Sequence, residues 1–444
     1  MLKFKTDEQT LNDLKIFPKY RKDTSIFGYF DKTKTRGGSI ALHKLMYSPF
    51  NAYKDIVDQV DAIKYSFRLE EEINLCLNDD KLDIIEYYLN LNTASLRDNL
   101  LDALFDKISY KLKPTNGYYL TLQALKYIQE HFNFLGLLIE SFKGEKLPVF
   151  FAGLRDDVIA IQKNQDFESL FNNEKKKISF RQINHFDALL KDKYSELLKQ
   201  VIKKTYLLDA YLSVGKIAQE GDFTFPKFIN SETPKFNAKQ LFHPFVPKPV
   251  PCDFELGKNK NLCFLTGPNM AGKSTFLKAV ALTIYLAHIG FPVPSKDCTL
   301  SVFNGLFTTI NLSDDIEIGY SHYYSEVKRV KEIATQIKEQ KNLLIIFDEL
   351  FRGTNVKDAC DSGLLVTKGF LNSKKSLFLI SSHITEIGEE LESEKCVDLK
   401  YFESRLDGDV PVNTYQIKEG ISSERHGLAI VNREGIAEIL ENAI

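Results

Sequence analysis

A glycine-rich octapeptide in the second half of the chain has the residue types that bind a nucleoside triphosphate. Residues 267–274 fit the pattern G-x-x-x-x-G-K-[ST], directly after an apolar strand pattern and before a helical pattern over 275–287. Glycines let the backbone wrap phosphates, so that successive N–H groups and the helix N-terminus face the negative charge. We expect ATP to bind here through Gly267, Pro268, Asn269, Met270, Ala271, Gly272, Lys273, Ser274 and Thr275.

Two side chains of this loop have separate expected roles. Lys273 would contact the β- and γ-phosphates, and the hydroxyl of Ser274 would ligate Mg²⁺. A chance glycine-rich turn is the alternative interpretation of the bare pattern. The order of strand, loop and helix disfavours that alternative.

Two carboxylates follow a buried strand pattern over residues 343–347. Ligands of parallel sheets bind at the carboxyl ends of the strands, and this strand ends in Asp348 and Glu349. We expect Asp348 to hold the Mg²⁺ shell and Glu349 to polarise the attacking water. An ordinary polar strand end is the alternative.

A histidine follows a third apolar strand pattern, over residues 377–381. This order predicts that His383 lies at the same sheet edge as the γ-phosphate, where it would take part in catalysis. A lone histidine is weak evidence, because a surface or capping role is as common for this residue type.

The spacing of apolar residues divides the chain into a helical part and an alternating part. Residues 70–220 show helical spacing, and 186–220 read as one long amphipathic helix. Prolines cluster between residues 225 and 253, which predicts a connection there. Beyond it, strand and helix patterns alternate, which predicts a mostly parallel sheet flanked by helices.

Composition limits the classes of protein and partner. The 444 residues are 43% hydrophobic and 27% charged, as in ordinary globular proteins. A net charge of −2 provides no global attraction to polyanions, so nucleic-acid binding would have to be local. The six cysteines have no zinc spacing and are expected to be reduced. The charged N-terminus and the lack of an apolar run of roughly 18 residues favour a cytoplasmic protein without membrane partners.

The order of these motifs resembles the MutS family of mismatch-repair ATPases, a branch of the ABC-type ATPases. Residues 266–275 differ from the usual phosphate loop of that family at Ala271, which replaces a glycine. Residues 348–354 resemble its Asp-Glu-Leu-Gly-Arg-Gly-Thr motif, with Phe351 in place of a glycine. Neither difference removes a ligand.

A further segment, residues 313–326, is similar to the family's signature segment, in which a serine completes the site of a partner subunit. The resemblance places that serine at Ser321 and implies a homodimer. A Gly-x-Ser sequence that opens a helix also offers a hydroxyl and free N–H groups to an anion. Alternatively, Ser321 only caps its helix.

The resemblance implies a fold of the α plus α/β class. Residues 1–235 would form a helical core and lever region, and 236–444 an ABC-type P-loop ATPase domain whose tail, 427–443, supports dimerisation. Residues 7–16, 37–49, 207–226 and 242–244 carry the weaker upstream resemblance. No counterpart of the family's N-terminal mismatch-recognition and connector domains is expected, and the only Phe-x-Glu is 347–349. The base contact stays unassigned, because no aromatic residue lies at Pro249 or Val250.

The resemblance also implies a mechanism. ATP binding would close two ATPase domains on each other, and the lever regions would change their grip on DNA. Backbone contacts carry no sequence information, so the substrate would be a DNA structure, with further DNA-repair proteins as partners. The alternative is a nucleotide-dependent dimerising module that recruits a protein partner without binding DNA, which the low overall basicity favours.

Overall fold

The chain forms two compact units. The computed structural model describes residues 4–20, 22–91, 93–97, 99–112, 116–142, 146–171, 178–257, 259–310, 322–339, 341–407 and 410–422. We call one unit the sheet unit, made of Met1–Gly28, Ser48–Ile56 and Ala218–Ile444. The other is the helical unit, made of Tyr29–Tyr47 and Val57–Ile217.

These units do not follow the boundary at residue 235 that we drew from the sequence. The first 28 residues belong to the sheet unit. The chain returns from the helical unit to the sheet unit after residue 217, within the helix Ser195–Glu220. The assignment of family domains to 1–235 and 236–444 stays a prediction. Among the described residues, no helix is both long and apolar enough to cross a membrane.

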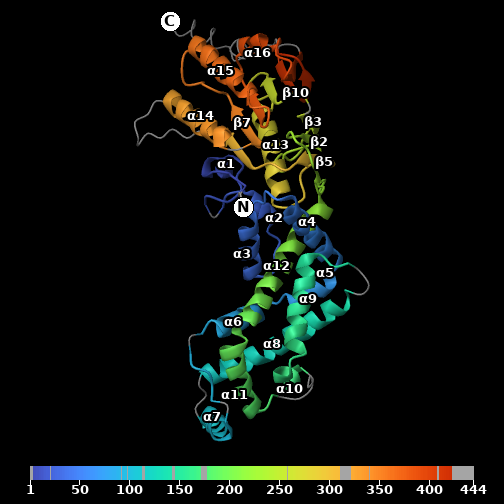
Figure 1. Ribbon diagram of the computed structural model, residues 1–444, viewed down its shortest axis with the longest axis vertical. Coiled ribbons are helices and arrows are strands. Elements are labelled where there is room, and N and C mark those ends of the chain that lie inside the picture. The colour runs from blue at the N-terminus through green and yellow to red at the C-terminus, as the bar shows by residue number, and fades with distance from the viewer. Residues whose placement is uncertain are drawn as a thin grey trace, which may run out of the picture. The chain divides into compact units, whose positions relative to one another are not determined.

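The helical unit confirms the helical spacing of residues 70–220 (Figure 1). Two of its helices, α4 and α12, and the short helix α2 cross from one unit's ranges into the other's. The helices are α2 (Ile26–Phe30), α3 (Arg36–Met46), α4 (Tyr53–Arg68), α5 (Glu70–Cys76), α6 (Asp79–Leu89), α7 (Leu100–Leu112), α8 (Asn116–Glu140), α9 (Val149–Gln162), α10 (Glu168–Phe171), α11 (Phe180–Ala188) and α12 (Ser195–Glu220), with a 3₁₀ turn at Gln165–Phe167.

The single amphipathic helix predicted over residues 186–220 is wrong. Helix α11 ends at Ala188, a π-helical turn spans Leu189–Lys193, and α12 begins at Ser195. The fully buried carboxylate of Asp187 accepts hydrogen bonds from the Tyr88 hydroxyl and the Leu96 amide, both at 2.7 Å, which fixes the chain just before the π turn. Apolar spacing alone does not reveal such an interruption, because the extra residue of a π turn leaves the neighbouring helical patterns intact.

Two adjacent glycines let α3 approach α12 closely. A Cβ atom on Gly37 would lie 2.3 Å from the ring of Tyr206, and one on Gly38 would lie 2.2 Å from Oδ2 of Asp209. Asp209 accepts hydrogen bonds from the amide and hydroxyl of Thr35, the N-cap of α3, at 2.8 and 2.7 Å. The buried carboxylate therefore holds the N-terminus of α3, and any larger residue at these glycines would clash with α12.

The sheet unit contains two sheets. In the six-stranded sheet, the order is β10-β9-β4-β8-β7-β6, with β10 antiparallel to β9 and the other pairs parallel. The mostly parallel sheet is thereby confirmed. The second sheet has the order β1-β5-β2-β3 and is mixed. The strands are β1 (Lys227–Ile229), β2 (Phe236–Leu241), β3 (Cys252–Leu256), β4 (Leu262–Thr266), β5 (Asp297–Ser301), β6 (Gly305–Thr309), β7 (Leu343–Asp348), β8 (Leu377–Ser381), β9 (Val397–Asp407) and β10 (Val410–Glu419).

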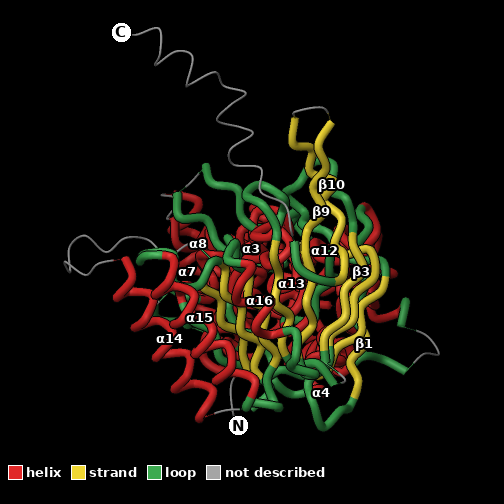
Figure 2. The backbone as a smooth tube through the Cα atoms, turned by 90° about the horizontal axis from the view of Figure 1, so that it is seen from above, coloured by secondary structure: helices red, strands yellow, loops and turns green. Residues whose placement is uncertain are grey.

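Helices cover both faces of the six-stranded sheet, as its continuous apolar strands require. Leu343, Ile345 and Phe347 of β7 pack in one cluster with residues of α14 (His322–Glu339), α15 (Val356–Leu371) and α16 (Thr385–Leu391). Figure 2 shows α14 and α15 to one side of the strands. Helix α13 (Lys273–His288) contacts β6, β7 and β8, and α1 (Glu8–Asp13) packs against β6.

Candidate nucleotide site

Three neighbouring strands bring the predicted site residues to one edge of the sheet. Strand β8 pairs with β4 on one side and with β7 on the other, so that Ser381 lies beside both Leu265 and Asp348. All three strands run parallel, and their carboxyl ends therefore meet at the same edge. The glycine-rich loop follows β4, Glu349 follows β7, and Ser382 and His383 follow β8. The expectation that these segments meet is confirmed.

The glycine-rich loop connects β4 directly to α13, which begins at Lys273, two residues earlier than predicted. Gly267 and Gly272 have φ values of 142° and 107°, in the region that only glycine adopts without strain. Met270 also has a positive φ, 67°, and its side chain is 89% exposed. Ala271, which stands where the family has glycine, is buried and does not have a positive φ. Its methyl group is therefore compatible with the loop.

Lys273 lies across the loop. Its Nζ atom donates hydrogen bonds to the carbonyl oxygens of Gly267 at 2.8 Å and Pro268 at 3.0 Å. Burial lowers the pKa of Lys273 from its usual value, while the charges of Glu349 and Asp348 act in the opposite direction. Ser274 and Thr275 are exposed on the first turn of α13. The loop thus combines a buried lysine ammonium with an exposed hydroxyl on the first turn of a helix.

The two carboxylates after β7 are held in different ways. Asp348 is the last strand residue and accepts a hydrogen bond from the hydroxyl of Ser381. Glu349 has left the strand with a φ of 56°, and its amide donates to the carbonyl of Ser381 at 3.1 Å. Its Oε2 atom lies 3.9 Å from Nη1 of Arg352. One carboxylate is fixed in the sheet and the other projects from a strained turn, which suits a metal ligand and a water-orienting group respectively.

The residue that replaces a family glycine in this turn has a left-handed backbone. Phe351 has a φ of 64°, which is uncommon for a residue with a large side chain. Its ring is buried, 5.7 Å from the ring of Tyr323 on α14, within the cluster beneath β7. Packing of the ring offsets the strain of the backbone.

His383 lies at the predicted edge with an exposed side chain. The amide of Ser382 donates to the carbonyl of Leu265 at 3.0 Å, and the Ser382 hydroxyl accepts from the amide of Ile384 at 3.0 Å. These bonds join the start of this turn to β4, next to the glycine-rich loop. His383 thus follows β8 at this edge of the sheet, and its place beside a γ-phosphate and its role in catalysis stay predictions.

A pocket of 260 Å³ adjoins the glycine-rich loop, and sequence reasoning did not identify it in full. Pro249 and Val250, where the family resemblance would place the base contact, line this pocket, and the base contact itself stays unassigned. Aromatic side chains reach the pocket from distant segments, and of these segments only 242–244 stood out in the sequence. Its lining includes Phe242, His243, Gly272, Phe276, Phe402 and Tyr415.

Two of these rings have defined surroundings. Tyr415 lies at an irregularity of β10, and a Cβ atom on Gly272 would be 3.4 Å from its ring, so the ring lies against the loop. Burial, followed by the charges of Lys278 and Lys15, lowers the pKa of His243 to about 4. His243 is therefore neutral near pH 7. A flat, uncharged group fits this combination of aromatic and apolar surfaces better than an ion does.

The structure thus combines a mixed α/β fold with a glycine-rich loop, a lysine and a pair of carboxylates at one sheet edge. Residues 263–444 match the family model described as MutS domain V. The resemblance of the motifs to the MutS family is thereby confirmed, and over these residues the chain is similar to MutS domain V.

Three similar proteins each have the name DNA mismatch repair protein MutS. The one from Persephonella marina is 29% identical over 266 residues, which are 58% of this chain and 29% of that protein. The one from Listeria monocytogenes is 30% identical over 265 residues, 58% of this chain and 30% of that protein. The one from Pseudothermotoga lettingae is 27% identical over 286 residues, 63% and 35% respectively. The chain thus spans about a third of the length of these relatives.

Two predicted features lie outside the described residues. One is Ser321 with the preceding segment 313–320, and the other is the tail 427–443. Both stay predictions.

Proposed function

We propose that this chain binds ATP with Mg²⁺ at the edge formed by β4, β8 and β7, and hydrolyses it. The single observation that supports this proposal best is the meeting of the glycine-rich loop with Asp348 and Glu349 across adjacent strands. An exposed serine hydroxyl and a carboxylate are the oxygen ligands that Mg²⁺ prefers, so Ser274 and Asp348 fit that ion. The ion would neutralise charge on the phosphates.

The remaining roles follow from the positions of the side chains. Lys273 would exchange its two carbonyl partners for phosphate oxygens, which are stronger acceptors for an ammonium group. Glu349 would orient the attacking water, and His383 would contact the γ-phosphate from the end of β8. The pocket lined by Tyr415, His243 and Val250 would accept the base.

Two variants test the nucleotide proposal, with Glu392→Gln as the matched control on an exposed glutamate. Glu349→Gln should keep ATP affinity within about twofold and slow hydrolysis by at least about 100-fold, because it removes general-base function and keeps the shape. Lys273→Ala should weaken affinity by about tenfold or more, since it removes a charge-assisted contact. Equilibrium binding of a fluorescent ATP analogue and release of phosphate measure both. Unchanged hydrolysis by Glu349→Gln would contradict the assignment.

We also propose that ATP hydrolysis at a composite dimer site, completed by Ser321 of a second copy, controls the engagement of DNA. The match of residues 263–444 to MutS domain V supports this, and so does the name of the relatives, which is that of a DNA mismatch repair protein. The ligand would be a DNA structure, because backbone contacts carry no sequence information. In the only Phe-x-Glu of this sequence, Phe347 is buried at the end of β7, so it offers no wedge for a mismatch.

Binding titrations with a matched duplex, a single-mismatch duplex and a four-way junction at several salt concentrations test the DNA proposal. We expect the junction to bind most tightly, with a steep loss of affinity as salt rises, and a mismatch preference below about tenfold, or 1.4 kcal/mol. The net charge of −2 favours the alternative, a nucleotide-dependent module that recruits a protein partner. Absence of salt-sensitive binding to all three DNAs would support that alternative.

A further inference from the structure

One arginine lies between two carboxylates that belong to different elements. Nη1 of Arg352 is 3.9 Å from Oε2 of Glu349, and its Nε is 4.0 Å from Oε1 of Glu326. Arg352 follows β7 in the same turn as Glu349, whereas Glu326 lies on α14. The Glu326 side chain is only 7% exposed, so α14 brings a buried carboxyl group to the turn.

The backbone of this turn needs support from outside. Glu349 and Phe351 both have left-handed φ values, 56° and 64°, and each such residue costs of the order of 1 kcal/mol or more. The ring of Phe351 fixes the middle of the turn by packing against Tyr323 of α14. Arg352 is a cation within ion-pair distance of the Glu349 side chain. Helix α14 therefore contacts the turn through both Tyr323 and Glu326.

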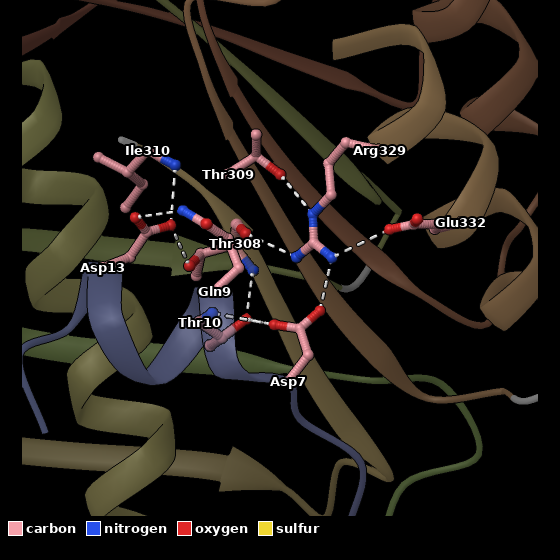
Figure 3. Close-up of polar contacts among 9 residues, drawn as sticks. All are labelled: Asp7, Gln9, Thr10, Asp13, Thr308, Thr309, Ile310, Arg329 and Glu332. Atoms are coloured by element: carbon pink, nitrogen blue, oxygen red, sulfur yellow. Dashed lines mark hydrogen bonds and ion pairs between the residues drawn. The ribbon is translucent and has the colours of Figure 1, made fainter. Parts of the chain in front are cut away.

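Helix α14 is in turn bonded to β6, the strand that pairs with β7. Arg329, one turn after Glu326, donates hydrogen bonds to Oδ2 of Asp7 at 2.6 Å, to the Thr308 carbonyl at 2.9 Å and to the Thr309 hydroxyl at 3.2 Å (Figure 3). Its side chain is 10% exposed. Asp13 of α1 accepts from the Thr308 hydroxyl at 2.7 Å and so ties the same end of β6 to α1. These bonds fix the position from which Glu326 reaches Arg352.

The space among these residues is too small for a ligand. A cavity of 20 Å³ is lined by Ile310, Glu326, Glu349 and Arg352, among others. It has room for about one water molecule. The side chains of Glu326, Glu349 and Arg352 therefore interact with one another, and they do not form a separate ligand site.

We propose that Arg352 and Glu326 are positioning residues for the hydrolysis reaction: Glu326 orients the Arg352 guanidinium, and Arg352 holds the Glu349 carboxylate at the end of β7. This inference rests on the proposed function. A planar guanidinium can address two carboxylates at once, whereas an ammonium group is a single point charge. Accurate placement matters because a displacement of about 1 Å at a reacting group can cost about 100-fold in rate.

Single-turnover hydrolysis and equilibrium ATP affinity of three single variants and one double variant test the proposal. Arg352→Met should slow hydrolysis by about 10- to 100-fold with affinity within about twofold. Arg352→Lys should recover part of the loss, because the charge remains. Glu326→Gln should slow hydrolysis less than Arg352→Met does, and the two changes together should be no slower than Arg352→Met alone, since Glu326 acts through Arg352.

Two comparisons separate positioning from general structural damage. Arg155→Met, which removes an arginine of similar exposure, 41% against 43%, from an ion pair in the helical unit, should leave the rate unchanged. Adding Arg352→Met to Glu349→Gln should not slow the residual rate further. If Arg352→Met fails to fold, Arg352→Lys and Glu326→Gln decide.

Several outcomes would overturn the proposal. One is a hydrolysis rate for Arg352→Met or Glu326→Gln equal to that of the unmodified protein. Another is ATP affinity that falls in parallel with the rate. The third is an effect of Arg352→Met that multiplies with that of Glu326→Gln or Glu349→Gln. Failure of the proposed function is distinguishable, because then the unmodified protein would hydrolyse no ATP, or Glu349→Gln would hydrolyse it at the normal rate.

Discussion

A buried histidine at the end of α13 should make the sheet unit sensitive to mild acid. His288 has no exposed surface; its Nδ1 lies 2.7 Å from the Phe50 carbonyl, and its Nε2 accepts from the Phe303 amide at 3.1 Å. These partners fix the neutral tautomer, with the proton on Nδ1. Burial lowers the pKa of His288 from 6.5 to about 4, although the hydrogen bond to Phe50 opposes the change. The dipole at the helix end also favours the cation, but only by roughly 0.3–2 kcal/mol.

The direction of the effect follows from the lowered pKa. The folded state binds the proton less readily than the unfolded chain, so the stability due to His288 is present above pH 6.5 and is lost as the pH falls toward 4. Between pH 7 and pH 5 this linkage removes about 2 kcal/mol from the free energy of unfolding.

The variant His288→Gln isolates this contribution, because an amide can donate to Phe50 and accept from Phe303 but does not titrate. Urea unfolding followed by far-UV circular dichroism at pH 7 and pH 5 gives the free energy of unfolding of both proteins. The unmodified protein should lose about 2 kcal/mol more than the variant between these pH values. His131 and His243, whose pKa values burial also lowers to about 4, remain in both proteins and cancel. Equal losses would refute the reasoning.

Three further predictions concern the two units and the dimer. Gly38→Ala should lower the free energy of unfolding of the helical unit by about 2 kcal/mol or more in urea, because the added Cβ would lie 2.2 Å from a carboxylate of α12. The control is Gly117→Ala, whose added Cβ would have nothing within 4 Å. Its free energy of unfolding should stay within about 1 kcal/mol of that of the unmodified protein. Phe351→Gly should be more stable to thermal unfolding than Phe351→Ala by about 1 kcal/mol, the reverse of the usual order in regular structure, because φ is 64°. Ser321→Ala and Lys273→Ala chains, each inactive in phosphate release, should partly recover activity when mixed; no recovery in demonstrated heterodimers would leave Ser321 as a helix cap.

The local chemistry of the site could be read from the sequence. The glycine-rich loop and the strands ending at Thr266 and Asp348 each depend on fewer than about ten consecutive residues, and patterns of that length are local. Continuous apolar strands alternating with helices also predicted the mostly parallel sheet, since both faces of such a sheet must be covered. Within the site, the first residue of α13 differs from the prediction, because this helix begins at Lys273.

Contacts between distant segments required the tertiary structure. The placement of β8 between β4 and β7, the ring of Tyr415 against Gly272, and the contact of Glu326 with Arg352 join residues 26 to 143 positions apart. Likewise, the buried carboxylate of Asp187, just before the π turn, accepts hydrogen bonds from Tyr88 and Leu96, which lie 99 and 91 positions earlier in the chain. Periodicity records which face of an element is buried, but not which other element covers it. That choice depends on the packing of whole side chains and on the pairing of buried polar groups, which is settled only when all the elements come together.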